Sequence, residues 1–160
     1  MKITKRENGN NTILEIDEAR IVYRNFSGTP GKFNANGERS FAIVIPEEYA
    51  DELEADGWHV KRRPAAEEGE EPFNTLPVKV KYTERMRPTI YLDDGENIKQ
   101  ISEEVINMID DLNISSVDMD IRPYHWTMAA GNSGITAYLQ SMCVHFTPDR
   151  FARRMNDVIE

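Results

Sequence analysis

The chain has 160 residues, of which 39% are hydrophobic, and a formal net charge of −9 at pH 7. This length suits one domain with its own core, residues 1–160, and excludes two large domains. No apolar run approaches the ~20 residues that span a bilayer, and the start of the chain has no secretory pattern. The single cysteine, Cys143, excludes an internal disulfide and multi-cysteine metal sites. We therefore expect a cytoplasmic protein with no membrane contact and no cofactor.

The charges are grouped rather than evenly mixed. Seventeen of the 28 acidic residues fall in four short segments: 47–56, 67–71, 93–96 and 103–111. Eleven of the 19 basic residues fall in three others: 20–39, 58–66 and 79–87. The net charge argues against a simple cationic nucleic-acid binder, but local grouping matters more to a ligand once separations exceed the ~8–10 Å screening length.

The first half of the chain predicts two strands and a helix. Residues 12–26 are rich in β-branched and aromatic residues and predict a long strand. Its apolar alternation slips near Asp17 and Glu18, which indicates a bulge. Residues 39–46 predict a buried strand, and residues 46–58 a short surface helix.

The middle of the chain predicts two further strands. A strand at 58–64 is followed by a polar, acidic loop, 65–74, which we expect to be mobile. Residues 76–82 alternate with period two, so the valines and Tyr82 face one side while Lys79 and Lys81 face the other.

The last part of the chain predicts two hairpins and a helix. Residues 89–101 indicate a hairpin with a turn at 93–97, and residues 102–112 a helix. The clearest hairpin pairs 116–126 with 135–146, because glycine and asparagine between them supply the positive φ of a tight turn. A short segment, 148–160, ends the chain.

About seven strands and two short helices, without regular strand–helix alternation, favour a compact antiparallel fold. We expect a mainly β domain with short helices (β+α), an OB-like open Greek-key β-barrel with helical inserts.

The loop in "RNFSGTPGKFNANGERSF" (24–41) is the first candidate site. It is not a P-loop, because Gly28 precedes Gly31 by only three positions and Phe33 follows Lys32. No helix begins after the glycines, so the dinucleotide fingerprint fails as well. The segment is either a plain connection or a phosphate contact made by its backbone amides, asparagines and bases.

A basic stripe and several aromatic rings are the second candidate. In "VKVKYTERMRP", four bases form a stripe of ~20 Å at ~3.3 Å per residue, a length comparable with a few nucleotides of single strand. The alternative is an ordinary solvated face of the sheet. Most aromatic residues must be core. The better candidates for stacking on a base lie beside arginines in less regular segments, namely Phe26, Phe33, Tyr82 and Trp126.

Two other classes of function stay open. Asp118 and Asp120 alternate on a predicted strand and, with Asp93 or Glu96, could hold the divalent cation of a metal-dependent nuclease or resolvase. The three histidines lack zinc-ligand spacing. A protein–protein assembly module is the remaining alternative.

Five segments together resemble, in order and spacing, a family of single-stranded-DNA-binding proteins encoded by tailed bacteriophages and prophages. The most specific parts are the asparagine–phenylalanine–glycine loop with its downstream Gly-x-Arg-x-Phe, "DGW" at 56–58 and "RPYHW" at 122–126. The resemblance implies a non-catalytic, OB-like barrel that coats single strands without reading sequence. It also implies phage replication or recombination proteins as partners.

The chain departs from that family at its end. Many such proteins end in an acidic tail that recruits partners, whereas this chain ends in "FARRMNDVIE", of mixed sign. The acidic loop 65–72 or the helix 47–56 is the alternative partner surface. The residues predicted to contact single-stranded DNA are Arg24, Asn25, Phe26, Lys32, Phe33, Arg39, Lys61, Arg62, Lys79, Lys81, Tyr82, Arg85, Arg87, Arg122, Tyr124 and Trp126.

Overall fold

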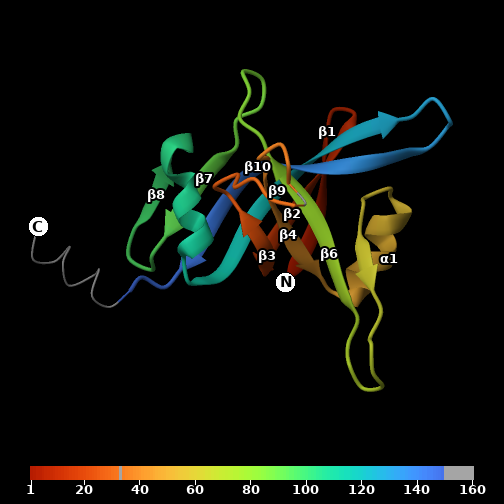
Figure 1. The fold of residues 1–160 in the computed structure, drawn as a ribbon, viewed down its shortest axis with the longest axis horizontal. Helices are drawn as coiled ribbons and strands as arrows, with labels where there is room; N and C mark the ends of the chain where they lie inside the picture. Colours follow the sequence, from red (N-terminus) through yellow and green to blue (C-terminus); the bar gives the residue numbers. More distant parts are fainter. Residues whose placement is uncertain (33, 150–160) are drawn as a thin grey trace, which may run out of the picture.

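The computed structural model describes residues 1–32 and 34–149, and Phe33 and the predicted segment 150–160 lie outside them. Within these ranges the chain forms ten strands and two short helices (Figure 1). The strands are β1 (Lys2–Asn8), β2 (Asn11–Ala19), β3 (Ile21–Asn25), β4 (Arg39–Ile45), β5 (Lys61–Arg63), β6 (Phe73–Val80), β7 (Thr89–Asp93), β8 (Ile98–Ile101), β9 (Ile114–Thr127) and β10 (Ser133–Phe146). The helices are α1 (Glu47–Ala55) and a 3₁₀ helix (Glu103–Asp111). The predicted mainly β class is confirmed.

The strands form one mixed sheet in the order β1-β2-β9-β10-β6-β4-β3. β10 pairs with β9 along its length, and its other edge is shared by two parallel neighbours, β6 and then β7. β5 extends the sheet beside β6, and β8 beside β7. The hydrogen-bonded path is open, since it begins at β1 and ends at β3.

One bent stretch of chain, β2 followed by β3, connects the part of the sheet around β9 with the part around β4. β2 pairs with β9 as far as Ala19, the carbonyl of Arg20 accepts the Val44 amide at 2.9 Å, and Ile21 pairs with β4. The pairing of β2 with β9 shifts between Ile16 and Ala19, and Glu18 there has φ +53°. The predicted irregularity is confirmed, and it lets consecutive residues pair with two different parts of the sheet.

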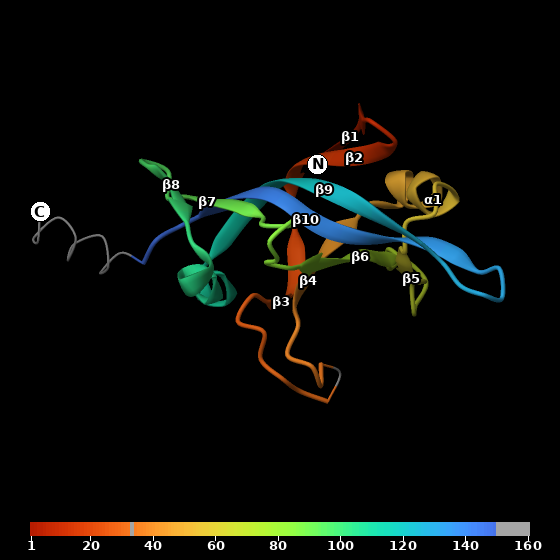
Figure 2. The ribbon, with the colours of Figure 1, turned by 90° about the horizontal axis from the view of Figure 1, so that it is seen from above.

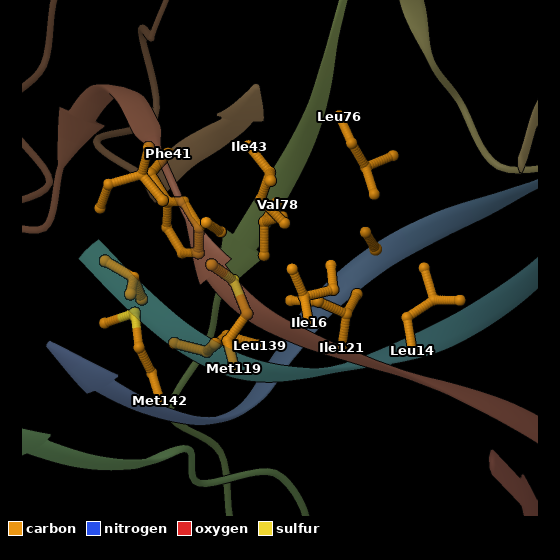
Figure 3. Close-up of a cluster of buried hydrophobic side chains, with 14 of the residues drawn as sticks. Leu14, Ile16, Phe41, Ile43, Leu76, Val78, Met119, Ile121, Leu139 and Met142 are labelled. Atoms are coloured by element: carbon orange, nitrogen blue, oxygen red, sulfur yellow. The ribbon is translucent and has the colours of Figure 1, made fainter. Parts of the chain in front are cut away.

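The core fills the space enclosed by this curved sheet. Alternate side chains of β2, β4, β6, β9 and β10 point inward and are buried, as Figure 3 shows for Ile16, Ile43, Val78, Ile121 and Leu139. Period-two alternation explains the selection, because every second residue of a strand shares a face. Each such side chain contributes about 1.5–3 kcal/mol when it is removed from water.

Two helices cover parts of the sheet. α1 buries Ala50 and Leu53 against the core, and the 3₁₀ helix buries Ile106 and Ile109. Both were expected as helices, although the second is 3₁₀. No helix in the described ranges is both long and apolar enough to cross a bilayer.

Several boundaries differ from the predicted ones. β1 was not predicted, because its residues are mostly charged and only Ile3 is half-buried. The strand expected at 58–64 forms only at β5. β6 begins three residues earlier than expected and ends at Val80. The chain then bends and passes through the buried Pro88 before the next strand begins.

Phe26 is fully buried and its ring stacks on Phe41, with the ring centres 5.2 Å apart. We expect Phe26→Ala to lower the free energy of unfolding by about 3–5 kcal/mol, because truncating a buried aromatic ring leaves a cavity. Phe26→Leu should cost less. Chemical denaturation monitors both, and an unchanged midpoint for Phe26→Ala would contradict this packing role.

Candidate nucleic-acid interface

The loop between β3 and β4 is folded by its own polar side chains. Asn25 Oδ1 accepts the Thr29 amide at 2.9 Å, and its Nδ2 donates to the Thr29 carbonyl at 3.2 Å. Asn34 Oδ1 accepts the Glu38 amide at 3.0 Å, and its Nδ2 donates to the Glu38 carbonyl at 2.8 Å. Asn25 was predicted to contact DNA and Asn34 to meet phosphates, and in the structure both side chains bond to the backbone of their own loop.

Two glycines let the arms of this loop cross closely. Gly28 and Gly37 have φ of +69° and +65°, and a Cβ on Gly28 would lie 2.8 Å from the Gly37 carbonyl oxygen. Any other residue at Gly28 would therefore have both an unfavourable φ and a contact that is too short. Figure 2 shows the loop projecting from the sheet below β3 and β4.

The base of the loop is attached to the 3₁₀ helix. The amides of Phe26 and Ser27 donate to the Asp110 carboxylate at 2.7 and 3.1 Å. Arg24 Nη1 donates to the carbonyls of Ile109 and Leu112, both at 2.8 Å. The guanidinium thus satisfies carbonyls at the end of the helix, where no intrahelical donor remains.

Two predicted contacts therefore serve the fold. Phe26 is wrong as a base-stacking residue, because its ring is buried against Phe41. Arg24 is half-buried and bonded to the 3₁₀ helix, so its interactions are with the protein. Lys32 lies exposed at the loop tip.

Arg39 and Tyr82, both predicted, lie together at the other side of the loop base. The Arg39 guanidinium is 5.5 Å from the centre of the Tyr82 ring and forms an ion pair with Glu103 of the 3₁₀ helix at 2.8 Å. Burial raises the pKa of Tyr82. The arginine thus lies over a ring and is partly neutralised by one carboxylate.

The outer face of β6, β10 and β9 carries a group that we call the aromatic–basic face: Lys79, Lys81, Arg122, Tyr124 and Tyr138. Tyr138 pairs with Lys79 on one side and with Arg122 on the other. Lys81 Nζ lies 5.9 Å from the Tyr138 ring centre, and the Tyr124 ring meets the Tyr138 ring edge-on at 6.0 Å.

The direction of these side chains follows from strand alternation. Ala137 and Leu139 are buried, so Tyr138 between them points outward, and Lys79 is outward between Val78 and Val80. Tyr138 was not among the predicted contacts. The alternating "ITAYLQ" pattern was the signal that could have identified it.

The remaining predicted residues near this face have mixed surroundings. The Arg122 guanidinium contacts the Met86 sulfur, and Arg85 and Arg87 are exposed on either side of that methionine. Trp126 covers Gly134 across the β9–β10 hairpin, where an added Cβ would lie 2.7 Å from the indole. Trp126 therefore packs the hairpin.

β5 divides its bases between two sides. Lys61 and Arg63 pair opposite Thr75 and Phe73, whereas Arg62 between them turns toward α1. Arg62 forms ion pairs with Glu47, with Asp51 at 2.8 Å and with Glu54 at 3.8 Å. The prediction of Arg62 as a DNA contact is not supported, because three carboxylates surround its charge.

The carboxylates considered for a metal site meet at a histidine instead. His145 Nδ1 lies 2.7 Å from Asp93 and its Nε2 lies 2.7 Å from Asp118, which also accepts the Glu18 amide at 2.8 Å. Asp120 lies 3.6 Å from Arg6. The described ranges contain no group of three or more His, Cys, Asp or Glu side chains placed to hold a metal ion.

This Asp–His–Asp cluster shifts the pKa of each member. The hydrogen bond with Asp118, followed by that with Asp93, raises the pKa of His145. The Gly95 amide and then His145 lower the pKa of Asp93. Burial disfavours the Asp118 carboxylate, but its bonds with the Glu18 amide and His145 together lower its pKa. The arrangement is thus most favourable with a protonated imidazole between two carboxylates.

We expect the stability advantage of the wild type over His145→Gln to be largest between about pH 4 and pH 6.5. It should decline as the pH rises through the raised pKa of His145, and again as the pH falls through the lowered pKa values of Asp93 and Asp118. Urea unfolding across pH measures this difference. His59→Gln, at an exposed histidine, is the control, and a pH-independent difference for His145→Gln would contradict the cluster.

Comparison with known proteins identifies the family of the chain. The family model described as "Putative phage ssDNA-binding domain" matches residues 3–160. The single-stranded DNA-binding protein from bacteriophage Enc34 has a similar fold, with a TM-score of 0.53 at 13% identity over 94% of this chain and 93% of that chain. Its C-terminal truncation gives the same score and identity over 92% and 97%.

A third solved structure, the single-stranded DNA-binding protein gp2.5 of bacteriophage T7, has a TM-score of 0.44 at 12% identity over 87% of this chain and 88% of that chain. No protein with a curated description matches the sequence. Since the family model covers nearly every residue, the chain belongs to the phage single-stranded-DNA-binding domain family.

Proposed function

We propose that the protein binds single-stranded DNA without reading its sequence, on the outer face of the sheet. The observation that carries the proposal is the contact chain in which Lys81 lies against Tyr138 and Tyr138 against Tyr124. Exposed rings beside cations suit a single strand, because bases stack on the rings while cations hold the backbone. Stacking of this kind contributes about 1–3 kcal/mol per base.

The strand order supports an OB-type barrel. If β2 and β3 count as one bent first strand, the order around the sheet is first strand, β4, β6, β10, β9 and back to the first strand. An OB fold is a five-stranded, partly open Greek-key barrel that binds oligonucleotides on its second and third strands and on the loops after its first and fourth. Those parts are β4, β6, the loop at 26–38 and the turn at 128–132.

Charge separation within the molecule explains how an acidic chain could hold DNA. Lys79, Lys81 and Arg122 share the outer face, while many carboxylates lie on α1, in the 65–72 loop and around His145. Arg39 would contact DNA only if a phosphate displaced Glu103 from its guanidinium. Five other predicted residues extend the proposed path: Lys32, Lys61, Tyr82, Arg85 and Arg87.

The role in the phage follows from this binding. A sequence-independent coat protects the single strands that replication and recombination expose, so we place the protein in the host cytoplasm beside proteins of those processes. The acidic loop 65–72 is the proposed partner surface. In this proposal the protein acts by binding alone and catalyses no reaction.

We expect affinity for oligo(dT) to fall steeply with salt, with a log–log slope near −0.7 per phosphate neutralised. Lys79→Ala with Lys81→Ala should weaken binding roughly tenfold or more and reduce the slope by about 1.4, since two phosphate contacts are lost. Fluorescence anisotropy measures both quantities. Lys99→Ala, at an exposed lysine on β8, is the matched control. A flat salt curve, or equal effects of the control, would contradict the proposed face.

The nuclease alternative predicts a different result. Labelled single strands incubated with the protein and Mg²⁺ or Mn²⁺ should remain intact if it acts by binding alone, as denaturing gels would show. Cleavage that disappears in Asp118→Asn would overturn the non-catalytic assignment. A native gel shift on the same samples tests the assembly-module alternative, which predicts no shift at all.

A further inference from the structure

Tyr23 combines an exposed ring with a backbone conformation that residues other than glycine rarely adopt. Its side chain is 62% exposed and its φ is +53°. It lies where the pairing of β3 with β4 shifts between Val22 and Asn25. A positive φ costs free energy. Because the ring is mostly exposed, its burial offsets little of that cost. Strain of this kind concentrates at binding sites.

The ring borders a pocket that lies outside the aromatic–basic face. The pocket has a volume of about 410 Å³ and lies between β3, β5 and the start of β6. Besides Tyr23, its lining consists of Lys61, Arg62, Arg63, Pro64, Phe73 and Thr75. The Arg62 guanidinium is ion-paired with Asp51 of α1, so Lys61 and Arg63, which pair opposite Thr75 and Phe73, are the bases that supply charge to the pocket.

The chemistry of the pocket matches a nucleotide. The Arg63 guanidinium lies 5.5 Å from the Phe73 ring centre, so a cation and a half-buried ring are already in contact. Tyr23 supplies a second ring and Lys61 a second cation, and no described residue that lines the pocket is acidic. A base can stack on a ring while cations bind the adjoining phosphates.

We propose that this pocket binds one nucleotide of the single strand, with the base against Tyr23 and Phe73 and the phosphates at Lys61 and Arg63. The inference rests on the proposed function and extends it. Phe73 and Lys79 lie on the same face of β6, six residues or about 20 Å apart. A strand bound at the aromatic–basic face would therefore reach the pocket within a few nucleotides.

Tyr23→Asn is the sharpest test, because asparagine tolerates positive φ better than most residues and removes the ring. Tyr91→Asn makes the same change at another exposed strand tyrosine, which lies beside Asp118 and Asp120. For an oligo(dT) of roughly 16 nucleotides, the upper site size of one OB fold, Tyr23→Asn should weaken binding roughly 5- to 150-fold. Tyr23→Phe and Tyr91→Asn should bind like the wild type. Tyr23→Asn should also keep the wild-type melting temperature.

The outcomes separate the two proposals. If the wild type binds and the Lys79/Lys81 variant is weakened while Tyr23→Asn is not, the pocket is overturned and the proposed function stands. If the wild type does not bind, the proposed function itself fails. Cross-linking with oligonucleotides containing 5-iododeoxyuridine adds a second readout. Adducts at Tyr23 or Phe73 support the pocket, whereas adducts confined to residues 122–138 contradict it.

Discussion

The fold depends on the bend between β2 and β3. Within three residues, Ala19, Arg20 and Ile21, the backbone leaves β9 and begins to pair with β4. The Asp118 carboxylate accepts the Glu18 amide at the irregular position, so the bend is also held by a side chain of the neighbouring strand. Without it, β4 and β9 could not lie on opposite sides of one core, and the outer face of β6 and β10 would have no curved support.

Ion pairing divides the bases of the molecule into two groups. Arg62 and Lys5 fasten α1 to the sheet from two directions, Arg62 through Asp51 and Lys5 through Glu52. Lys79 and Lys81 instead lie beside an aromatic strand neighbour, Tyr138. A net charge of −9 therefore says little about the surface that a polyanion would meet, because many carboxylates are already opposite a cation or far from that face.

Local patterns predicted most of the sheet but little of the site. Apolar alternation and turn residues are visible within a single segment of the sequence. The hairpin of β9 and β10, the bent strand and α1 were therefore all predicted. β1 was missed because an edge strand needs few apolar residues. The partners of Arg24 and Arg62 come from distant segments, which no local pattern reveals. Phe26 lies beside an arginine as predicted, but the loop turns its ring inward, while the shift after Val22 leaves Tyr23 outside.

The long strands β9 and β10 extend past their neighbours as a two-stranded ribbon (Figure 2). β2 pairs with β9 only up to Ile121, and β6 pairs with β10 only from Ala137. The ribbon is joined to the body near its root, where the Ile135 amide donates to the Gly57 carbonyl at 3.0 Å. Among the described residues no other strand pairs with the tip beyond this hydrogen bond, so the ribbon can bend about its root while the rest of the sheet keeps its pairing.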